Sequence, residues 1–125
     1  MSPADIIAAL FVQASRPDCF EKAIEAAADA VIFDLEDAIA DVHKDSARQN
    51  LRSVDAANAI VRSNGIGTAW HENDLALVRK LKPLGIICPK SEAGLRFSEF
   101  LKSVDVPVIA LVEMAVGLSI ARRLL

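Results

Sequence analysis

Several kinds of residue are scarce in this 125-residue chain, and each scarcity excludes a class of protein. Two cysteines, Cys19 and Cys88, are too few for a framework of disulfide bonds, which favours a reducing, cytoplasmic location. There is no tyrosine, and no basic stripe interrupts a chain of net charge -3, so no nucleic-acid partner is expected. The first apolar run, residues 6–12, is too short to span a bilayer and follows no basic segment, so no membrane partner is expected.

Hydrophobic residues are plentiful, at 53% of the chain, and they occur as short apolar runs separated by helical patterns. The runs predict five strands, at residues 6–12, 31–37, 59–62, 85–88 and 108–112. The patterns between and after them predict helices that include residues 20–27, 44–58, 72–83, a segment beginning at Ser91, and 115–125. Apolar strands that alternate with helices indicate an α/β fold with a parallel sheet buried on both faces.

Five strand–helix units are fewer than the eight that close a (β/α)8 TIM barrel. The pattern therefore leaves two architectures open: a small open sheet, or the front part of a larger barrel. In both, the carboxyl ends of parallel strands meet at one edge, where such enzymes place their chemistry.

Charged residues stand at that predicted edge. Asp34, Glu36 and Asp37 end the second strand, and Arg62 ends the third. Side chains alternate along a strand, so Asp34 and Glu36 should share a face and Asp37 should take the other. The carboxylates either cap the next helix, pair with Arg62 or take part in catalysis, since perturbed charges gather in active sites. The guanidinium of Arg62 suits a substrate carboxylate, a neighbouring carboxylate, or both.

Glu113 ends the fifth strand after a run of apolar residues. A carboxylate there is costly unless it is paired or binds a cation such as Mg²⁺, and the alternative is a surface residue that caps the next helix. Lys90, at the end of the fourth strand, is expected to be solvated or to contact phosphate. His43 and His71 are expected at the surface, because no second histidine stands where a zinc site would need it.

These residues lie in a series of motifs that resembles the citrate lyase beta-subunit-like family, the HpcH/HpaI aldolase and malyl-CoA lyase group. The motifs, in order, are LFV at 10–12, RP at 16–17, ADAVIFDLEDA at 28–38, Lys44, AR at 47–48, VRSNG at 61–65, TAW at 68–70, PKSE at 89–92 and VIALVE at 108–113. The sequence departs from the family pattern at Gln13 and Ala69, where the family has proline, and at Met114, where it has threonine.

The resemblance implies a (β/α)8 barrel that makes or breaks carbon–carbon bonds in 3-hydroxy acyl-CoA thioesters with Mg²⁺. It implies that Glu113 is a metal ligand and contacts substrate, and that Arg62 holds the carboxylate of a keto acid. It further implies that Glu36 and Asp37 are catalytic supports near the metal-bound water, and that Lys44 faces the coenzyme A phosphates. The family also implies a homo-oligomer, a trimer or a hexamer.

On this interpretation residues 1–125 form a single domain, the N-terminal portion of a barrel lyase or aldolase, with a second metal carboxylate expected after Leu125. Two alternatives stay open. One is a truncated, catalytically inactive family member that needs a partner chain. The other is an unrelated flavodoxin-like α/β binding module, in which Glu113 and Arg62 are only structural.

Overall fold

The predicted strands form one sheet in the computed structural model, which describes residues 9–27, 29–37, 39–89, 99–100, 102–114 and 117–124, with side chains up to Ile109. Five strands lie parallel in the order of the chain: β1 (Ala9–Gln13), β2 (Ala30–Asp34), β3 (Ala59–Arg62), β4 (Gly85–Ile87) and β5 (Val108–Met114). A sixth strand, β6 (Gly117–Leu124), pairs antiparallel with β5. The predicted α/β fold with five parallel strands is therefore confirmed, and its strand order is that of a barrel built from successive strand–helix units.

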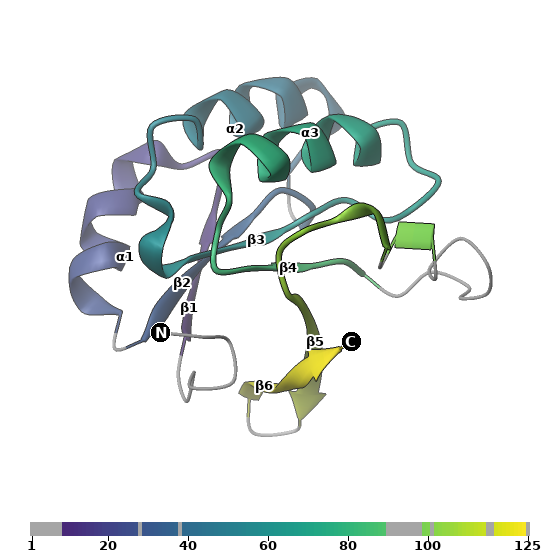
Figure 1. Cartoon of the computed structure of the whole chain (residues 1–125). Coiled ribbons are helices and arrows are strands. Elements are labelled where there is room, and N and C mark those ends of the chain that lie inside the picture. The colour runs from purple at the N-terminus through teal and green to yellow at the C-terminus, as the bar shows by residue number, and fades with distance from the viewer. Residues whose placement is uncertain are drawn as a thin grey trace.

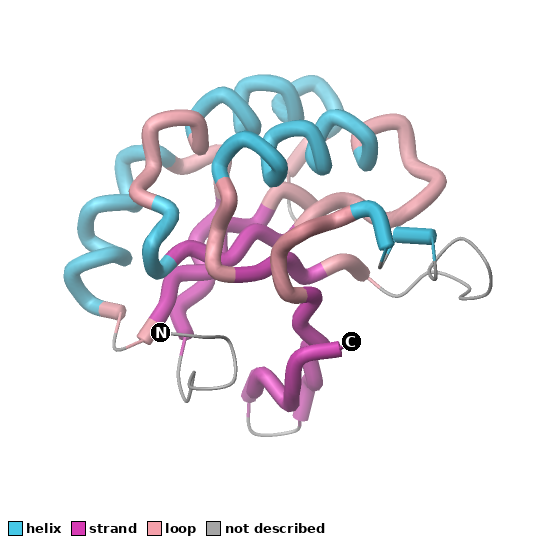
Figure 2. The backbone as a smooth tube through the Cα atoms, viewed as in Figure 1, coloured by secondary structure: helices cyan, strands magenta, loops and turns pink. Residues whose placement is uncertain are grey.

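Three α-helices connect the first four strands: α1 (Phe20–Ala26), α2 (Lys44–Asn50) and α3 (His71–Leu81). Short 3-10 turns precede α1, α2 and β3, at Pro17–Cys19, Asp41–His43 and Ala56–Asn58. All three α-helices lie over the same face of the sheet (Figure 1), and the backbone tube shows the strands as a layer beneath them (Figure 2). Because β1 to β5 are parallel, their carboxyl ends share one edge of the sheet.

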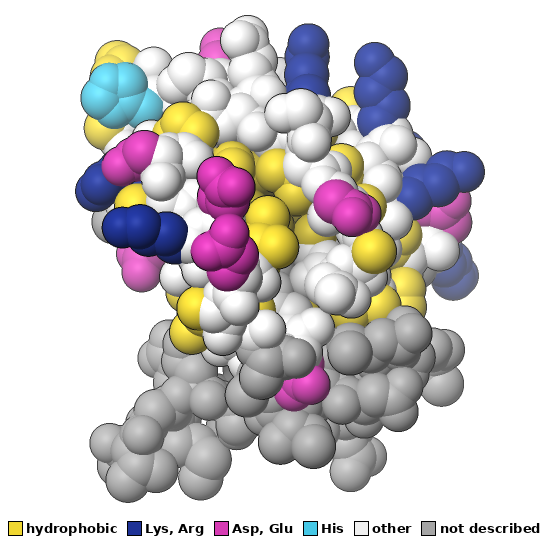
Figure 3. All heavy atoms as spheres, turned by 90° about the vertical axis from the view of Figure 1, so that its left-hand side faces the viewer, with side chains coloured by type: hydrophobic (Ala, Val, Ile, Leu, Met, Phe, Trp, Pro, Cys, Tyr) yellow, Lys and Arg dark blue, Asp and Glu magenta, His cyan; other side chains and the backbone are white. Residues whose placement is uncertain are grey.

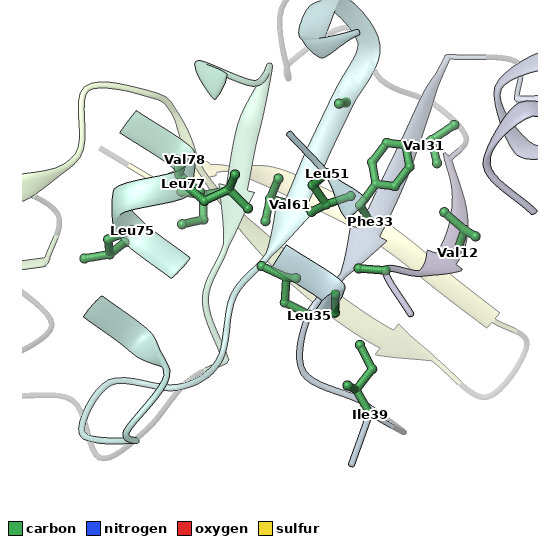
Figure 4. Packing of buried hydrophobic residues seen from close by; sticks show 14 of the residues in the cluster. Val12, Val31, Phe33, Leu35, Ile39, Leu51, Val61, Leu75, Leu77 and Val78 are labelled. Carbon is green, nitrogen blue, oxygen red and sulfur yellow. The ribbon is translucent and has the colours of Figure 1, made fainter. Parts of the chain in front are cut away.

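The main hydrophobic core fills the space between this sheet and its helices. Its side chains come from β2 and β3 on one side and from α3 and the end of α2 on the other (Figure 4). The labelled members of the cluster are Val12, Val31, Phe33, Leu35, Ile39, Leu51, Val61, Leu75, Leu77 and Val78. The ring of Phe20 meets that of Phe33 edge to face, with 4.9 Å between centroids, an arrangement that aromatic pairs favour.

The opposite face of the sheet carries a second, smaller cluster of buried apolar residues, which includes Ile32 of β2 and Ile60 of β3. Because side chains alternate along a strand, Phe33 points toward the helices while Ile32 points away from them. The same alternation places Asp34 and Arg62 on the face of Ile32 and Ile60. The face of the sheet opposite α1, α2 and α3 thus ends in charged groups at its carboxyl edge.

The first residue of β4 is glycine because β5 begins very close to it. A Cβ atom at Gly85 would lie 2.5 Å from Cδ1 of Ile109 and 3.1 Å from the carbonyl oxygen of Pro107. The absence of a side chain lets Ile86 pair with Val108 and so joins β5 to the sheet.

The second helix is shorter than predicted. The sequence predicts a helix over 44–58, whereas α2 ends at Asn50 and is followed by turns and the 3-10 helix Ala56–Asn58. The carboxylate of Asp55 accepts a hydrogen bond of 3.0 Å from the backbone N–H of Ala57. Such local side-chain bonds compete with the helical pattern and begin a new turn.

The third helix is close to its predicted extent of 72–83, and spans His71–Leu81. It stops where Lys82 adopts a left-handed conformation, with a φ of 51°, directly before Pro83. Of the fourth predicted helix, Ser91 lies outside the described residues, whereas Phe100 is helical and buried.

The prediction of a helix over 115–125 is wrong, since the structure places β6 there. Leu118 and Ile120 are two residues apart, a spacing that fits the period of a strand and would place them on opposite sides of a helix. The deciding interaction is not local. The free edge of β5 presents unpaired backbone groups, and β6 pairs with it from Met114↔Gly117 to Val108↔Leu124.

The surface is of mixed charge on the face in Figure 3. Acidic and basic side chains of both signs are scattered over it, with hydrophobic side chains visible between them. No helix within the described ranges is both long enough and apolar enough to cross a membrane.

Candidate active site

The carboxyl ends of β2 and β3 bring three charged side chains together. Asp34 and Arg62 are register partners in the parallel pairing of these strands. Nη1 of Arg62 lies 3.4 Å from Oδ2 of Asp34, and Nη2 lies 3.0 Å from Oε1 of Glu36. The Arg62 side chain is 17% exposed, so water and salt screen these pairs only in part. The prediction that Arg62 neutralises a carboxylate after the second strand is confirmed for Glu36, and Asp34 is its second partner.

Asp34 also organises the turn that follows β2. Its Oδ1 accepts hydrogen bonds from the backbone N–H groups of Glu36, at 2.9 Å, and of Asp37, at 3.1 Å. This Asx-type arrangement fixes the direction in which the chain leaves the strand. The Asp37 side chain is exposed and makes no ion pair with Arg62 in the part of the chain that the structure describes. Its predicted catalytic role stays a prediction.

One hydrogen-bond donor of Arg62 is unpaired among the described residues. Its Nε is buried and has no hydrogen-bond partner among the described residues. The ring of Phe11 lies 5.9 Å from the guanidinium carbon and covers it from another side. A buried donor without an acceptor costs about 1–3 kcal/mol, so the guanidinium has hydrogen-bonding capacity that the described residues do not use.

Burial raises the pKa of both carboxyl groups in this cluster. For Asp34 the two backbone N–H groups and Arg62 offset part of this rise in pKa. For Glu36 the Arg62 charge opposes the rise in pKa caused by burial, whereas the Asp34 charge adds to it. The folded chain therefore favours protonation of these groups more than water does, and carboxyl groups with perturbed pKa values are common in active sites.

The raised pKa of Asp34 predicts a pH-dependent loss of stability. A carboxyl whose pKa is raised on folding contributes its full stability below its ordinary value of 3.8, and loses it as the pH rises through the folded value. We therefore expect the free energy of unfolding of the wild type to fall, relative to that of Asp34→Asn, as the pH rises from below the ordinary pKa of 3.8. Urea unfolding at a series of pH values measures this difference.

Asp18→Asn provides a control of opposite sign. The Arg16 side chain lowers the pKa of Asp18, so its contribution to stability grows as the pH rises. A difference between wild type and Asp34→Asn that is constant or grows with pH would contradict the assignment.

Lys44 is placed differently from what a phosphate contact requires. It is the first residue of α2, it is 5% exposed, and its Nζ donates to the carbonyl oxygens of Leu35 at 3.2 Å and Glu36 at 3.1 Å. A third bond of 2.7 Å goes to Oδ1 of Asn64, and the ring of Trp70 lies 5.0 Å from the ammonium. These bonds use all three ammonium hydrogens. The predicted contact with coenzyme A phosphates remains untested, and the structure gives this lysine three other partners.

Glu113 lies on β5, beyond Val108, which pairs with Ile86 of β4. Its backbone thus belongs to the carboxyl half of a strand parallel to β2 and β3. Among the described side chains, no group of three His, Cys, Asp or Glu could hold a metal ion. The donors at this edge are nevertheless carboxylate oxygens, the ligands that Mg²⁺ prefers, and Mg²⁺ needs only one or two of them beside water and substrate. The residue types at this edge therefore fit Mg²⁺, and the role of Glu113 as a metal ligand stays a prediction. Lys90 lies outside the described residues.

A buried polar network behind the cluster is absent from the sequence-based prediction. Asp74 is 0% exposed; Nη1 of Arg48 donates to its Oδ1 at 3.0 Å, and the backbone N–H of Asn64 donates to its Oδ2 at 2.7 Å. The expectation that His71 lies at the surface is wrong, because it is buried with its Nδ1 2.9 Å from the carbonyl oxygen of Asn64. One signal was available: His71, Asp74, Leu75 and Val78 follow the spacing of a buried helical stripe, which places a carboxylate in the core.

A family model described as HpcH/HpaI aldolase/citrate lyase matches residues 8–121. The chain belongs to this family. The match confirms the resemblance seen in the motifs and overturns the alternative of an unrelated flavodoxin-like module.

Relatives in the HpcH/HpaI family are similar over most of this chain. A citrate lyase subunit beta-like protein of Mycobacterium tuberculosis (strain CDC 1551 / Oshkosh) is 40% identical over 110 residues, which cover 86% of this chain and 39% of that protein. A (3S)-malyl-CoA thioesterase of Cereibacter sphaeroides (strain ATCC 17025 / ATH 2.4.3) is 37% identical over 116 residues, 87% of this chain and 41% of that protein. The chain thus spans about two fifths of the length of these curated relatives.

Solved structures of the HpcH/HpaI family share the fold. CitE of Mycobacterium tuberculosis in complex with magnesium, acetoacetate and coenzyme A superposes with a TM-score of 0.71 at 38% identity, over 86% of this chain and 39% of that one. The citrate lyase beta subunit of M. tuberculosis with oxaloacetate and magnesium gives a TM-score of 0.71 at 37% identity, over 91% and 48%.

Proposed function

We propose that this chain is part of a Mg²⁺-dependent carbon–carbon lyase or aldolase that cleaves 3-hydroxy acyl-CoA thioesters into a keto acid and an acyl-CoA. The observation that carries the proposal is Arg62, a partly buried guanidinium at the carboxyl edge of the sheet, whose Nε has no partner among the described residues. We also propose that residues 1–125 are the N-terminal portion of one barrel domain, and that the protein is a cytoplasmic homo-oligomer.

Arg62 would bind the carboxylate of the keto acid. Asp34 and Glu36 hold its two terminal nitrogens at 3.4 Å and 3.0 Å, which fixes the orientation of Nε. A fixed guanidinium recognises a carboxylate through direction as well as charge. The complexes of family members with oxaloacetate and with acetoacetate support an acidic ligand of this kind.

Glu113 would hold the metal, and the magnesium in the related complexes supports this assignment. When bound, Mg²⁺ would polarise the hydroxyl and carboxylate oxygens of the substrate and offset negative charge during cleavage. The remaining steps are two proton transfers and the cleavage of one carbon–carbon bond. The substrate hydroxyl loses its proton, the bond between C2 and C3 breaks, C3 becomes the carbonyl of the keto acid, and C2 takes up a proton to give the acyl-CoA.

Glu36 and Asp37 are the side chains that we propose to support these proton transfers. Glu36 is about one-third exposed, and burial raises its pKa, so it can hold a proton and still reach the edge where substrate would bind. Asp37 follows it in the same turn, anchored through its backbone N–H to Asp34.

A second candidate is hydrolysis of the thioester, because one group of relatives bears the name (3S)-malyl-CoA thioesterase. The two reactions yield different products from one substrate. Cleavage of malyl-CoA gives glyoxylate and acetyl-CoA, whereas hydrolysis consumes water and gives malate and a free thiol. Product analysis therefore separates them.

The test is to incubate the purified protein, with the whole barrel of which this chain is the proposed N-terminal portion, with malyl-CoA or citramalyl-CoA, and to measure both the keto acid, as its hydrazone, and free thiol. We expect keto acid without free thiol, only when Mg²⁺ is present. Glu113→Gln should lower the rate by about a hundredfold or more, because a catalytic metal contributes several kcal/mol. Free thiol as the sole product would favour the thioesterase. No product from either thioester would favour the inactive family member that needs a partner.

A further inference from the structure

The turns that follow β2 and β3 are joined by buried polar side chains, which we call the Lys44–Asn64–Asp74 network. All three are almost completely buried, at 5%, 2% and 0% exposure. They come from three different places: the start of α2, the loop after β3 and the first turn of α3. Nothing in the proposed chemistry uses them, although burying a charged group is costly unless every partner is supplied.

Lys44 holds the turn after β2 by its backbone. Its Nζ donates to the carbonyl oxygens of Leu35 and Glu36, at 3.2 Å and 3.1 Å. These are the carbonyl groups immediately before and at the residue whose carboxylate meets Arg62. The ammonium therefore fixes the main chain from which the Glu36 side chain projects.

Asn64 ties that turn to the end of β3. It accepts from Lys44 through Oδ1 at 2.7 Å, and its Nδ2 donates to the carbonyl oxygen of Leu35 at 3.2 Å. The same Nδ2 and the backbone N–H of Asn64 both donate to Oδ2 of Asp74, at 2.7 Å. Asn64 stands two residues after Arg62. The network therefore holds the backbone next to both members of the Arg62–Glu36 pair.

We propose that Lys44 is a positioning residue for the site, which holds the turn carrying Glu36 in register with Arg62 through the Lys44–Asn64–Asp74 network. This inference rests on the proposed function for its effect on ligand binding, but its effect on the turn itself can be measured independently. It replaces a phosphate contact, because the ammonium is buried and its three hydrogens are committed. An apolar side chain of the same length would fill the space and release the turn.

The test compares Lys44→Met with Lys22→Met in the full chain. Lys22 is exposed on α1, so this control removes the same charge without touching the network. Two quantities are measured: the rates of amide hydrogen exchange at Glu36 and Asp37, and the Kd for oxaloacetate in the presence of Mg²⁺ by calorimetry. We expect Lys44→Met to speed exchange at these two amides and to weaken the affinity by about tenfold each, the effect of losing a charged hydrogen bond. Lys22→Met should change neither.

The outcomes are distinguishable. If wild type does not bind oxaloacetate, the proposed function fails, while the exchange rates still decide whether Lys44 holds the turn. Wild-type exchange and affinity in Lys44→Met would overturn the inference. Equal acceleration at all amides, those of α1 included, would also overturn it, because the role would then be general stability. Should Lys44→Met fail to fold, Lys44→Gln, which keeps an N–H donor, is expected to show the same local pattern with smaller changes.

Discussion

Replacing Asp74 by alanine should lower the free energy of unfolding by about 3–5 kcal/mol, the cost of removing one partner from a buried ion pair. Asp74 is fully buried and accepts three hydrogen bonds, from Nη1 of Arg48 at 3.0 Å and from the backbone N–H and Nδ2 of Asn64 at 2.7 Å each. The substitution would leave a 10% exposed guanidinium whose remaining ion-pair partner among the described residues, Asp45, is at the surface, and a buried backbone N–H without an acceptor.

Arg48 supplies a matched control for this prediction, because it pairs with two aspartates in different surroundings. Asp45 is 84% exposed, and Asp74 is 0% exposed. Asp45→Ala also removes an aspartate that pairs with Arg48. It should lower the free energy of unfolding by less than about 1 kcal/mol, as the loss of a surface pair does. Urea unfolding followed by circular dichroism measures both. Equal losses of stability in Asp45→Ala and Asp74→Ala would show that burial of the pair contributes nothing.

The same substitution connects stability to the site. Asp74 orients Asn64, and Asn64 in turn accepts from Lys44, which holds the turn of Glu36. Residues in one hydrogen-bond network couple, so their effects on stability should not add. The charged edge of the sheet is thus built on a buried polar layer that also stabilises the packing of α3.

Sequence patterns located the parallel strands well, because β2, β3 and β4 are apolar runs buried on both faces. Such runs are typical of the strands of a parallel sheet. The patterns failed where a short segment is decided by a distant strand or by a single side-chain hydrogen bond. Residues 117–124 form β6 because the edge of β5 lies beside them, and α2 stops early because Asp55 caps a new turn. Neither interaction is visible in local periodicity.

The site divides in the same way. Asp34 and Arg62 could be predicted to meet, because the parity of a strand and the shared edge of a parallel sheet are properties of sequence order. The sequence predicts Glu36 on the same strand face as Asp34, but β2 ends at Asp34, and Glu36 reaches Arg62 from the turn that follows. The partners of Lys44 could not be predicted, because they are two backbone carbonyl groups and an asparagine twenty positions away, and their approach depends on how two loops fold together. A lysine near an expected phosphate site and a lysine buried in a network look alike in the sequence.

Arg62→Ala should raise the KM for the keto acid, in the condensation direction, by about a hundredfold, while the KM for the acyl-CoA changes little. A charge-assisted bond and the orientation that it supplies together contribute about 3 kcal/mol, which corresponds to about a hundredfold in affinity. Arg62 lies between Asp34 and Glu36 and has its Nε unpaired within the described residues, so only the carboxylate-bearing reactant should feel its loss. Initial rates with each reactant varied in turn measure the two constants.

Arg16 provides the matched control, since it too is paired with a carboxylate, Asp18 at 2.9 Å, but on the exposed surface before α1. Arg16→Ala should leave both KM values unchanged. Arg62→Ala also leaves two partly buried carboxylates without their cation, so rates must be expressed per folded protein, with the folded fraction measured by circular dichroism. Arg62→Lys keeps the charge but not the fork, and should recover only part of the loss. An equal rise in both KM values would mean that Arg62 shapes the site as a whole and does not bind the keto acid, whereas a rise confined to the acyl-CoA would assign it to the thioester.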